Sequence, residues 1–128
     1  MPRAAESEDR VLATLREVCL ALPEAYETST WGHPNFRAGK KIFAAFHHSE
    51  GVPCIWARID PLEHHVLAGD PRFLDTRHGA PRWIAVRADR KLDWKMVRGL
   101  MEGAFRQIAP KALVEKLDAP HPRKRKSA

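Results

Sequence analysis

Cysteine and long hydrophobic runs are scarce in this chain of 128 residues. Its two cysteines, Cys19 and Cys54, stand in apolar surroundings and form no C-x-x-C pair, which argues against a cysteine zinc site and against a disulfide. No apolar run approaches the roughly 20 residues that span a bilayer. The first ten residues are polar and acidic, unlike a signal peptide, so we expect a cytoplasmic protein without membrane association.

Motifs of catalysis are also missing. The chain contains no G-x-S-x-G, no P-loop and no G-x-G-x-x-G. Histidines are frequent, but the adjacent pairs 47–48 and 64–65 would point to opposite faces of a strand, and no H-E-x-x-H occurs. We therefore expect no enzyme activity, no cofactor and no bound metal.

The positive charge is present but unevenly distributed. Of the net charge of +6, four charges come from Arg123, Lys124, Arg125 and Lys126, and without them 18 basic residues face 16 acidic ones. The remainder of the chain is therefore close to neutral, and the overall charge overstates how basic it is.

The length of the chain suits one domain. We expect that domain over residues 1–118, followed by a basic, disordered tail over 119–128, and we take a monomer as the expectation.

Two long segments have the 3.6-residue spacing of an amphipathic helix. The first begins after the cap residue Ser7 and ends at Pro23, and the second begins at the cap residue Asp93 and ends at Pro110. Shorter helices are predicted over 62–67, capped by Asp60, and over 110–117.

Between the long helices, alternating residues predict strands over 24–31, 35–38, 41–47, 52–59 and 83–88, with turns at Gly39 and Gly51 and a loop over 68–81. In the third strand we expect Ile42, Ala44 and Phe46 on one face and Phe43 and Ala45 on the other, which favours a central position. Helices before and after a run of strands indicate an α+β fold with both long helices on one face of an antiparallel sheet.

Three segments carry a resemblance to a known family. They read LPEAYETSTWGHPNFRAGKKIFAAF, PRWIAVRADRKLDW and AFRQIAPKAL, and they include the spaced residues Trp31, Phe36, Lys41, Phe43, Trp83 and Trp94. From about Ser7 to Leu117 the chain resembles the MmcQ/YjbR family. The resemblance implies a CyaY-like fold, in which two long helices pack on one face of an antiparallel sheet. It also implies DNA binding through a "double wing" arrangement, and it carries no catalytic residues.

Basic, polar and aromatic residues concentrate over residues 31–41, with further arginines near the loop 68–81. Lysine and arginine bind phosphates, and aromatic rings stack on bases. The predicted nucleic-acid-binding residues are Trp31, His33, Asn35, Arg37, Lys40, Lys41, Arg77 and Arg82. Two other interpretations stay open. The aromatics of the hairpin could be core and its charges merely solvated, or the sheet face could serve an adaptor that binds a protein or a small molecule, with no role in nucleic-acid binding.

Overall fold

Six antiparallel strands form one sheet in this computed structural model, which describes residues 7–74, 76 and 81–119. The strand order is β1-β2-β3-β4-β6-β5, so the third strand is central, as predicted. The short strand β5 lies within the segment predicted as a loop. The strands are β1 (Tyr26–Thr30), β2 (His33–Ala38), β3 (Lys41–Ser49), β4 (Val52–Arg58), β5 (Phe73–Leu74) and β6 (Trp83–Arg87).

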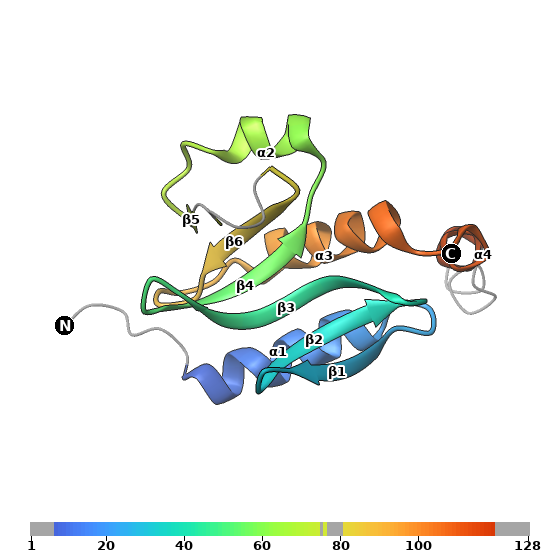
Figure 1. The fold of residues 1–128 in the computed structure, drawn as a ribbon, viewed down its shortest axis with the longest axis horizontal. Coiled ribbons are helices and arrows are strands. Elements are labelled where there is room, and N and C mark those ends of the chain that lie inside the picture. The colour runs from blue at the N-terminus through green and yellow to red at the C-terminus, as the bar shows by residue number, and fades with distance from the viewer. Residues whose placement is uncertain (1–6, 75, 77–80, 120–128) are drawn as a thin grey trace, which may run out of the picture.

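Four helices accompany the sheet, and they are α1 (Glu8–Leu20), α2 (Pro61–Leu67), α3 (Trp94–Ile108) and α4 (Lys111–Asp118). In Figure 1, α1 and α3 lie behind the sheet, α2 lies above it and α4 lies at one end. The fold is therefore α+β, as predicted. None of the helices in the described ranges is long and apolar enough to cross a bilayer. The predicted disorder of the tail falls on residues 120–128, which lie outside the described residues.

Each of the three predicted side-chain caps accepts a hydrogen bond from the first turn of its helix. Ser7 Oγ accepts from the backbone N–H of Arg10, Asp60 Oδ2 from that of Leu62, and Asp93 Oδ1 from those of Lys95 and Met96. Such bonds satisfy N–H groups that the helix itself leaves unpaired. The sequence therefore located the starts of α1, α2 and α3 correctly.

The hydrophobic core fills the space between the sheet and the pair α1 and α3. Phe43 of β3 meets Phe105 of α3 edge to face, with ring centroids 5.7 Å apart, and both side chains are fully buried. The buried residues of α1 and α3 that complete this layer are Val11, Leu15, Cys19, Val97, Met101 and Ala104. Because both of these helices lie on the same side, neither of them covers the opposite face of the sheet (Figure 1).

A β-bulge in β3 overturns part of the predicted side-chain pattern. Phe36 pairs with Ala44, but the next residue, Arg37, pairs with Ile42, so Phe43 is an extra residue. A bulge of this kind lets two consecutive side chains share a face. Phe43 therefore joins Ala44 in the core, while Ile42 lies on the open face beside Arg37. The strict alternation that we predicted for residues 41–47 is wrong at Ile42 and Phe43.

Two-residue turns connect the first four strands. Trp31 and Gly32, between β1 and β2, have φ of +55° and +79°, the type I′ pattern that matches the twist of a hairpin. Trp31 is thus a turn residue, not the end of a strand as predicted. Gly39, between β2 and β3, has φ of +66°, and a Cβ there would lie 2.9 Å from Cγ of Pro110, just after α3. Only glycine combines a positive φ with the absence of a Cβ that would clash with Pro110.

Candidate nucleic-acid interface

The sheet face turned away from α1 and α3, here called the open face, is defined by the strand register. Residues directly opposite in neighbouring strands point to the same side. Starting from Arg37, whose neighbour Phe36 is in the core, the pairings extend this face across all six strands. Its side chains are Tyr26, Thr28, Thr30, His33, Asn35, Arg37, Ile42, Ala45, His47, Ser49, Val52, Cys54, Trp56, Arg58, Leu74, Trp83, Ala85 and Arg87.

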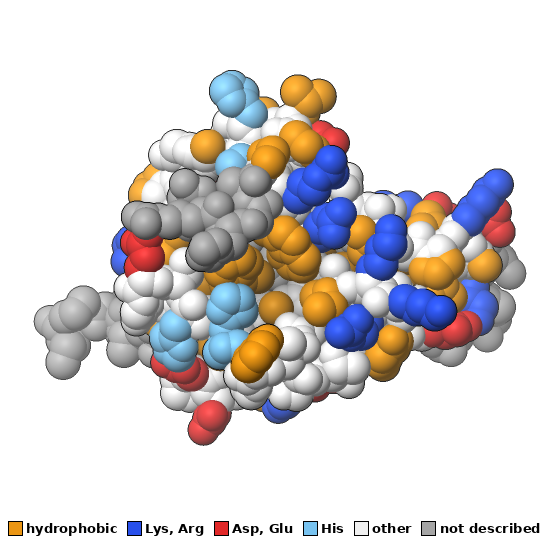
Figure 2. Space-filling view, in the orientation of Figure 1, with side chains coloured by type: hydrophobic (Ala, Val, Ile, Leu, Met, Phe, Trp, Pro, Cys, Tyr) orange, Lys and Arg blue, Asp and Glu red, His pale blue; other side chains and the backbone are white. Residues whose placement is uncertain are grey.

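No carboxylate occurs among these open-face side chains, although three of them are arginines. Arg87 is neutralised by Asp89, 2.7 Å away. Within the described part of the chain, Arg37 and Arg58 form no ion pair. Figure 2 shows this face, with Lys and Arg side chains scattered across its right half and acidic side chains at its margins. The open face is therefore locally cationic although the domain as a whole is nearly neutral.

Aromatic rings form a continuous series across three strands of the open face. The rings of His33 on β2 and His47 on β3 have centroids 4.8 Å apart. His47 in turn stacks on Trp56 of β4, at 4.3 Å and with 24° between the ring planes. Burial lowers the pKa of His47, and its Nδ1 donates to the carbonyl oxygen of His48 at 3.1 Å. His47 is therefore a neutral ring at pH 7, suited to stacking.

Two donors near this series have no hydrogen-bond partner in the described residues. Nε1 of Trp56 and Nε of Arg58 are both shielded from solvent, and neither donates a hydrogen bond within the described part of the chain. The guanidinium of Arg58 lies 5.9 Å from the ring centroid of Trp83, a cation–π distance. A buried donor without an acceptor costs about 1–3 kcal/mol.

The structure places four of the predicted site residues at or beside the open face. Trp31 is 92% exposed at the tip of the β1–β2 turn, and the exposed His33 follows on β2. Asn35 is buried, and its Nδ2 donates to Thr30 Oγ1 at 2.6 Å, so its hydrogen bond stabilises the β1–β2 hairpin. Arg37 donates from Nε to Thr28 Oγ1 and from Nη1 to the carbonyl oxygen of Lys40. These bonds hold the guanidinium on the face and leave Nη2 for a ligand.

Of the other four predicted residues, the three that are described lie apart from that group. Lys41 pairs with the core residue Ala38, so it lies on the side of the sheet that the helices cover, at its edge. Lys40 is exposed in the β2–β3 turn, and Arg82 is exposed just before β6. Arg77, like the neighbouring His78, lies outside the described residues. Arg72, which we expected to extend the surface, is paired with Asp70 at 2.7 Å.

Sequence reasoning missed the centre of the open face, which is formed by His47, Trp56, Arg58 and Trp83. A signal was present in the predicted strand 52–59, because residues two apart on a strand share a face. That rule places Cys54, Trp56 and Arg58 together, opposite the apolar Ile55 and Ala57. The adjacency of His33, His47 and Trp56 depends on the pairing of three strands, and local sequence does not reveal it.

The thiols and other potential ligands show no catalytic arrangement in the described residues. Burial raises the pKa of Cys54 to about 11, and burial also raises that of Cys19. Both are therefore protonated and weak nucleophiles at neutral pH. No group of three or more His, Cys, Asp or Glu side chains that could hold a metal ion occurs in the described part of the chain.

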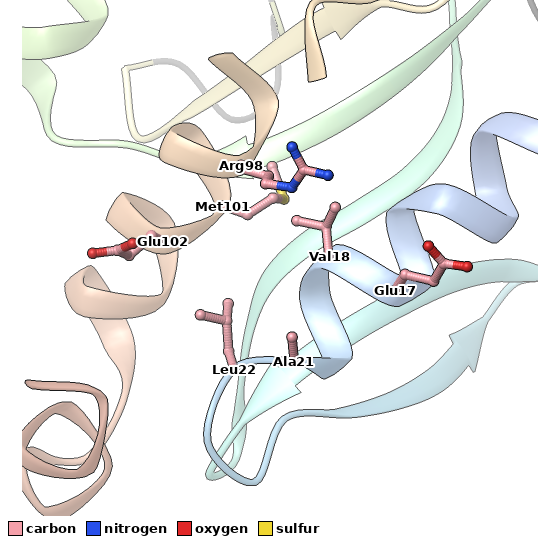
Figure 3. A pocket seen from close by; sticks show the side chains of 7 residues that line it. All are labelled: Glu17, Val18, Ala21, Leu22, Arg98, Met101 and Glu102. Atoms are coloured by element: carbon pink, nitrogen blue, oxygen red, sulfur yellow. The ribbon is translucent and has the colours of Figure 1, made fainter. Parts of the chain in front are cut away.

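A hollow lies on the other side of the molecule, between α1 and α3. It has a volume of about 240 Å³, and it is lined by Glu17, Val18, Ala21, Leu22, Arg98, Met101 and Glu102. In Figure 3 its apolar side chains face one another, while the carboxylates of Glu17 and Glu102 point away on opposite sides. With two acids beside one arginine, this groove is a poorer site for a polyanion than the open face.

Comparison with known proteins agrees with this architecture. A family model described as YjbR matches residues 20–107. A solved structure of protein DR2400 from Deinococcus radiodurans, which has a domain of the type DUF419, is similar with a TM-score of 0.62. The two chains share 19% identity, and the similarity covers 85% of this chain and 88% of the other. No curated protein matches the chain. The family match extends over well more than half of the residues, and the chain belongs to the YjbR family.

Proposed function

We propose that this protein is a small, non-catalytic DNA-binding protein of the MmcQ/YjbR type, with a CyaY-like or "double wing" fold, that acts in the cytoplasm. The observation that carries the proposal is the open face, where Arg37 and Arg58 lack carboxylate partners in the described residues and where no acidic side chain occurs among the residues that the strand register assigns to this face. Some arginines elsewhere are paired with acids, as Arg16 is with Glu27 and Arg106 with Asp118, although Arg98 forms no ion pair in the described residues. Unpaired cations on one face suit a polyanion.

The test is a fluorescence anisotropy titration of labelled DNA, offered both as single strand and as duplex, at about 50 and 200 mM salt, a range over which phosphate contacts weaken strongly. The full-length chain is compared with a variant in which Arg123, Lys124, Arg125 and Lys126 are replaced by serine. We expect salt-sensitive binding that survives this neutralisation, because the open face retains its own cations. If all binding disappears with the four tail charges, the folded body is not a DNA-binding module.

The alternative function is an adaptor that binds a protein or a small molecule. The observation that favours it is apolar exposure away from the cationic face. Leu62 and Val66, one turn apart on α2, are 78% and 76% exposed. An exposed apolar surface of this kind is typical of interaction sites. The same titration separates the two functions, because an adaptor without a nucleic-acid role would leave the tail-neutral variant unable to bind either form of DNA.

A further inference from the structure

We infer that the open face binds single-stranded DNA in preference to duplex, with a base added to the series of rings that ends at His33 and phosphates held by Arg37 and Arg58. This inference rests on the proposed function and specifies its ligand. It draws on three independent features of the open face, namely its ring contacts, its charge and the exposure of Trp31.

The ring series is open at one end. Trp56 is covered on one side by His47, and His47 is flanked by His33, but His33 is exposed and no further ring contacts it in the described residues. Trp31 stands two residues before His33, at the tip of the same hairpin, with 92% of its surface exposed. Every nucleobase has a π face, so an unstacked base can continue such a series without regard to sequence.

The cations are arranged beside the rings. Arg37 shares β2 with His33 and lies four residues further along, on the same face. Arg58 shares β4 with Trp56 and lies two residues further along. Because β2 and β4 are both antiparallel to β3, they run in the same direction, and each arginine is displaced the same way from the ring on its strand. A DNA backbone that passes over the arginines would leave its bases on the side of the rings.

The aromatic rings of the open face are poorly suited to binding a DNA duplex. In double-stranded DNA the faces of the bases are stacked on one another, and only their edges are displayed in the grooves. The rings of His47 and Trp56 are half-buried on the sheet, so they cannot enter a groove. Single-stranded DNA presents free base faces together with its phosphates, and binding grooves for it combine aromatic stacking with positive charge.

The experiment compares three labelled probes on the full-length protein at about 100 mM salt. They are an oligothymidine of about 12 nucleotides, within the usual site size of a single-strand-binding surface, a duplex of the same length, and an abasic oligonucleotide of that length, which carries phosphates but no bases. We expect the oligothymidine to bind at least about tenfold more tightly than either of the others, and to quench tryptophan fluorescence, because stacking is worth about 1–3 kcal/mol per base.

Charge-matched variants locate the site. Arg58→Gln is expected to weaken oligothymidine binding about three- to tenfold. Arg98→Gln removes the same charge from the α1–α3 groove and is expected to leave the affinity unchanged. Since Arg98 forms no ion pair in the described residues, its loss is a fair control. Trp31→Ala changes a side chain that packs on nothing buried, so it tests stacking without endangering the fold, and a loss of affinity of about threefold or more is expected.

Three results would overturn the inference. These are duplex binding as tight as that of oligothymidine, abasic binding as tight as that of oligothymidine, or equal losses in Arg58→Gln and Arg98→Gln. In the first two cases DNA binding itself would stand and only the preference for exposed bases would be lost. Absence of binding to all three probes would overturn the proposed function as well.

Discussion

At the scale of single residues, Trp31 combines two properties that the fold does not require. Its backbone has φ of +55°, a region in which bulky side chains are strained, and its indole is 92% exposed and so adds nothing to the core. Asparagine or glycine would suit this turn position better. A strained and exposed tryptophan is better explained by a contact with a ligand than by stability.

Replacing Trp31 should therefore separate stability from binding. Trp31→Asn is expected to stabilise the protein by about 0.5–1 kcal/mol, because asparagine tolerates the left-handed conformation. The thermal midpoint should rise by about 2–6 °C. DNA affinity should fall in the same variant, because the ring is gone. A lower midpoint would contradict this account of the turn, and the check is calorimetry alongside the anisotropy titration.

Arg37 and Lys41 offer a matched pair within one hairpin. They lie four residues apart, but the register assigns Arg37 to the open face and Lys41 to the opposite side. Arg37→Gln should weaken DNA binding about three- to tenfold, whereas Lys41→Gln, with the same change in charge, should leave it nearly unchanged. Since Arg37 also bonds to Thr28, urea unfolding of both variants shows whether lost affinity reflects lost structure. Equal losses in two folded variants would remove the hairpin's open face from the site.

At the scale of elements, the turn between β2 and β3 is fixed by a contact with the chain just after α3. Gly39 and Gly32 both have positive φ, but a Cβ added at Gly39 would lie 2.9 Å from Pro110, whereas one added at Gly32 would meet nothing within 4 Å. Gly32→Ala should cost about 1 kcal/mol of conformational strain. Gly39→Ala should cost about 2–4 kcal/mol, because overpacking adds to the same strain. Urea denaturation measures both, and equal costs would show that the contact with Pro110 is readily relieved.

Elements with a local cause were predictable from the sequence, and those with a distant cause were not. The starts of α1, α2 and α3 follow from cap residues a few positions away, and the alternation in β6 follows from its own sequence. The bulge at Phe43 does not follow from the local sequence, because the ring that it turns into the core packs against Phe105, far along the chain. The predicted site was incomplete for a similar reason, since apart from Arg77 and Arg82 its residues lie within 31–41, which covers only two strands of a face that crosses six.

At the scale of the whole molecule, charge is divided between two places with different consequences. The last residues contribute four positive charges, while the rest of the chain has an excess of only two. Among the described residues no acidic side chain belongs to the open face, and only Arg87 on that face has an acidic partner, Asp89, which lies just after β6. Total charge therefore describes the strength of non-specific attraction, whereas the local arrangement decides where DNA would lie.

The two contributions should separate in the salt dependence of DNA binding. Each phosphate neutralised on a single strand contributes about −0.7 to the slope of log affinity against log salt concentration. The full-length chain should therefore have a slope steeper by about 3 than the variant with four serines in the tail, if all four charges contact phosphates. The tail-neutral variant should keep a slope of about −1.4, from Arg37 and Arg58, the two cations of the open face that lack an acidic partner in the described residues. A titration series from about 50 to 300 mM salt gives both slopes. A slope near zero for the tail-neutral variant would mean that the cations of the open face contact no phosphates, even though the strand register places them on the same face.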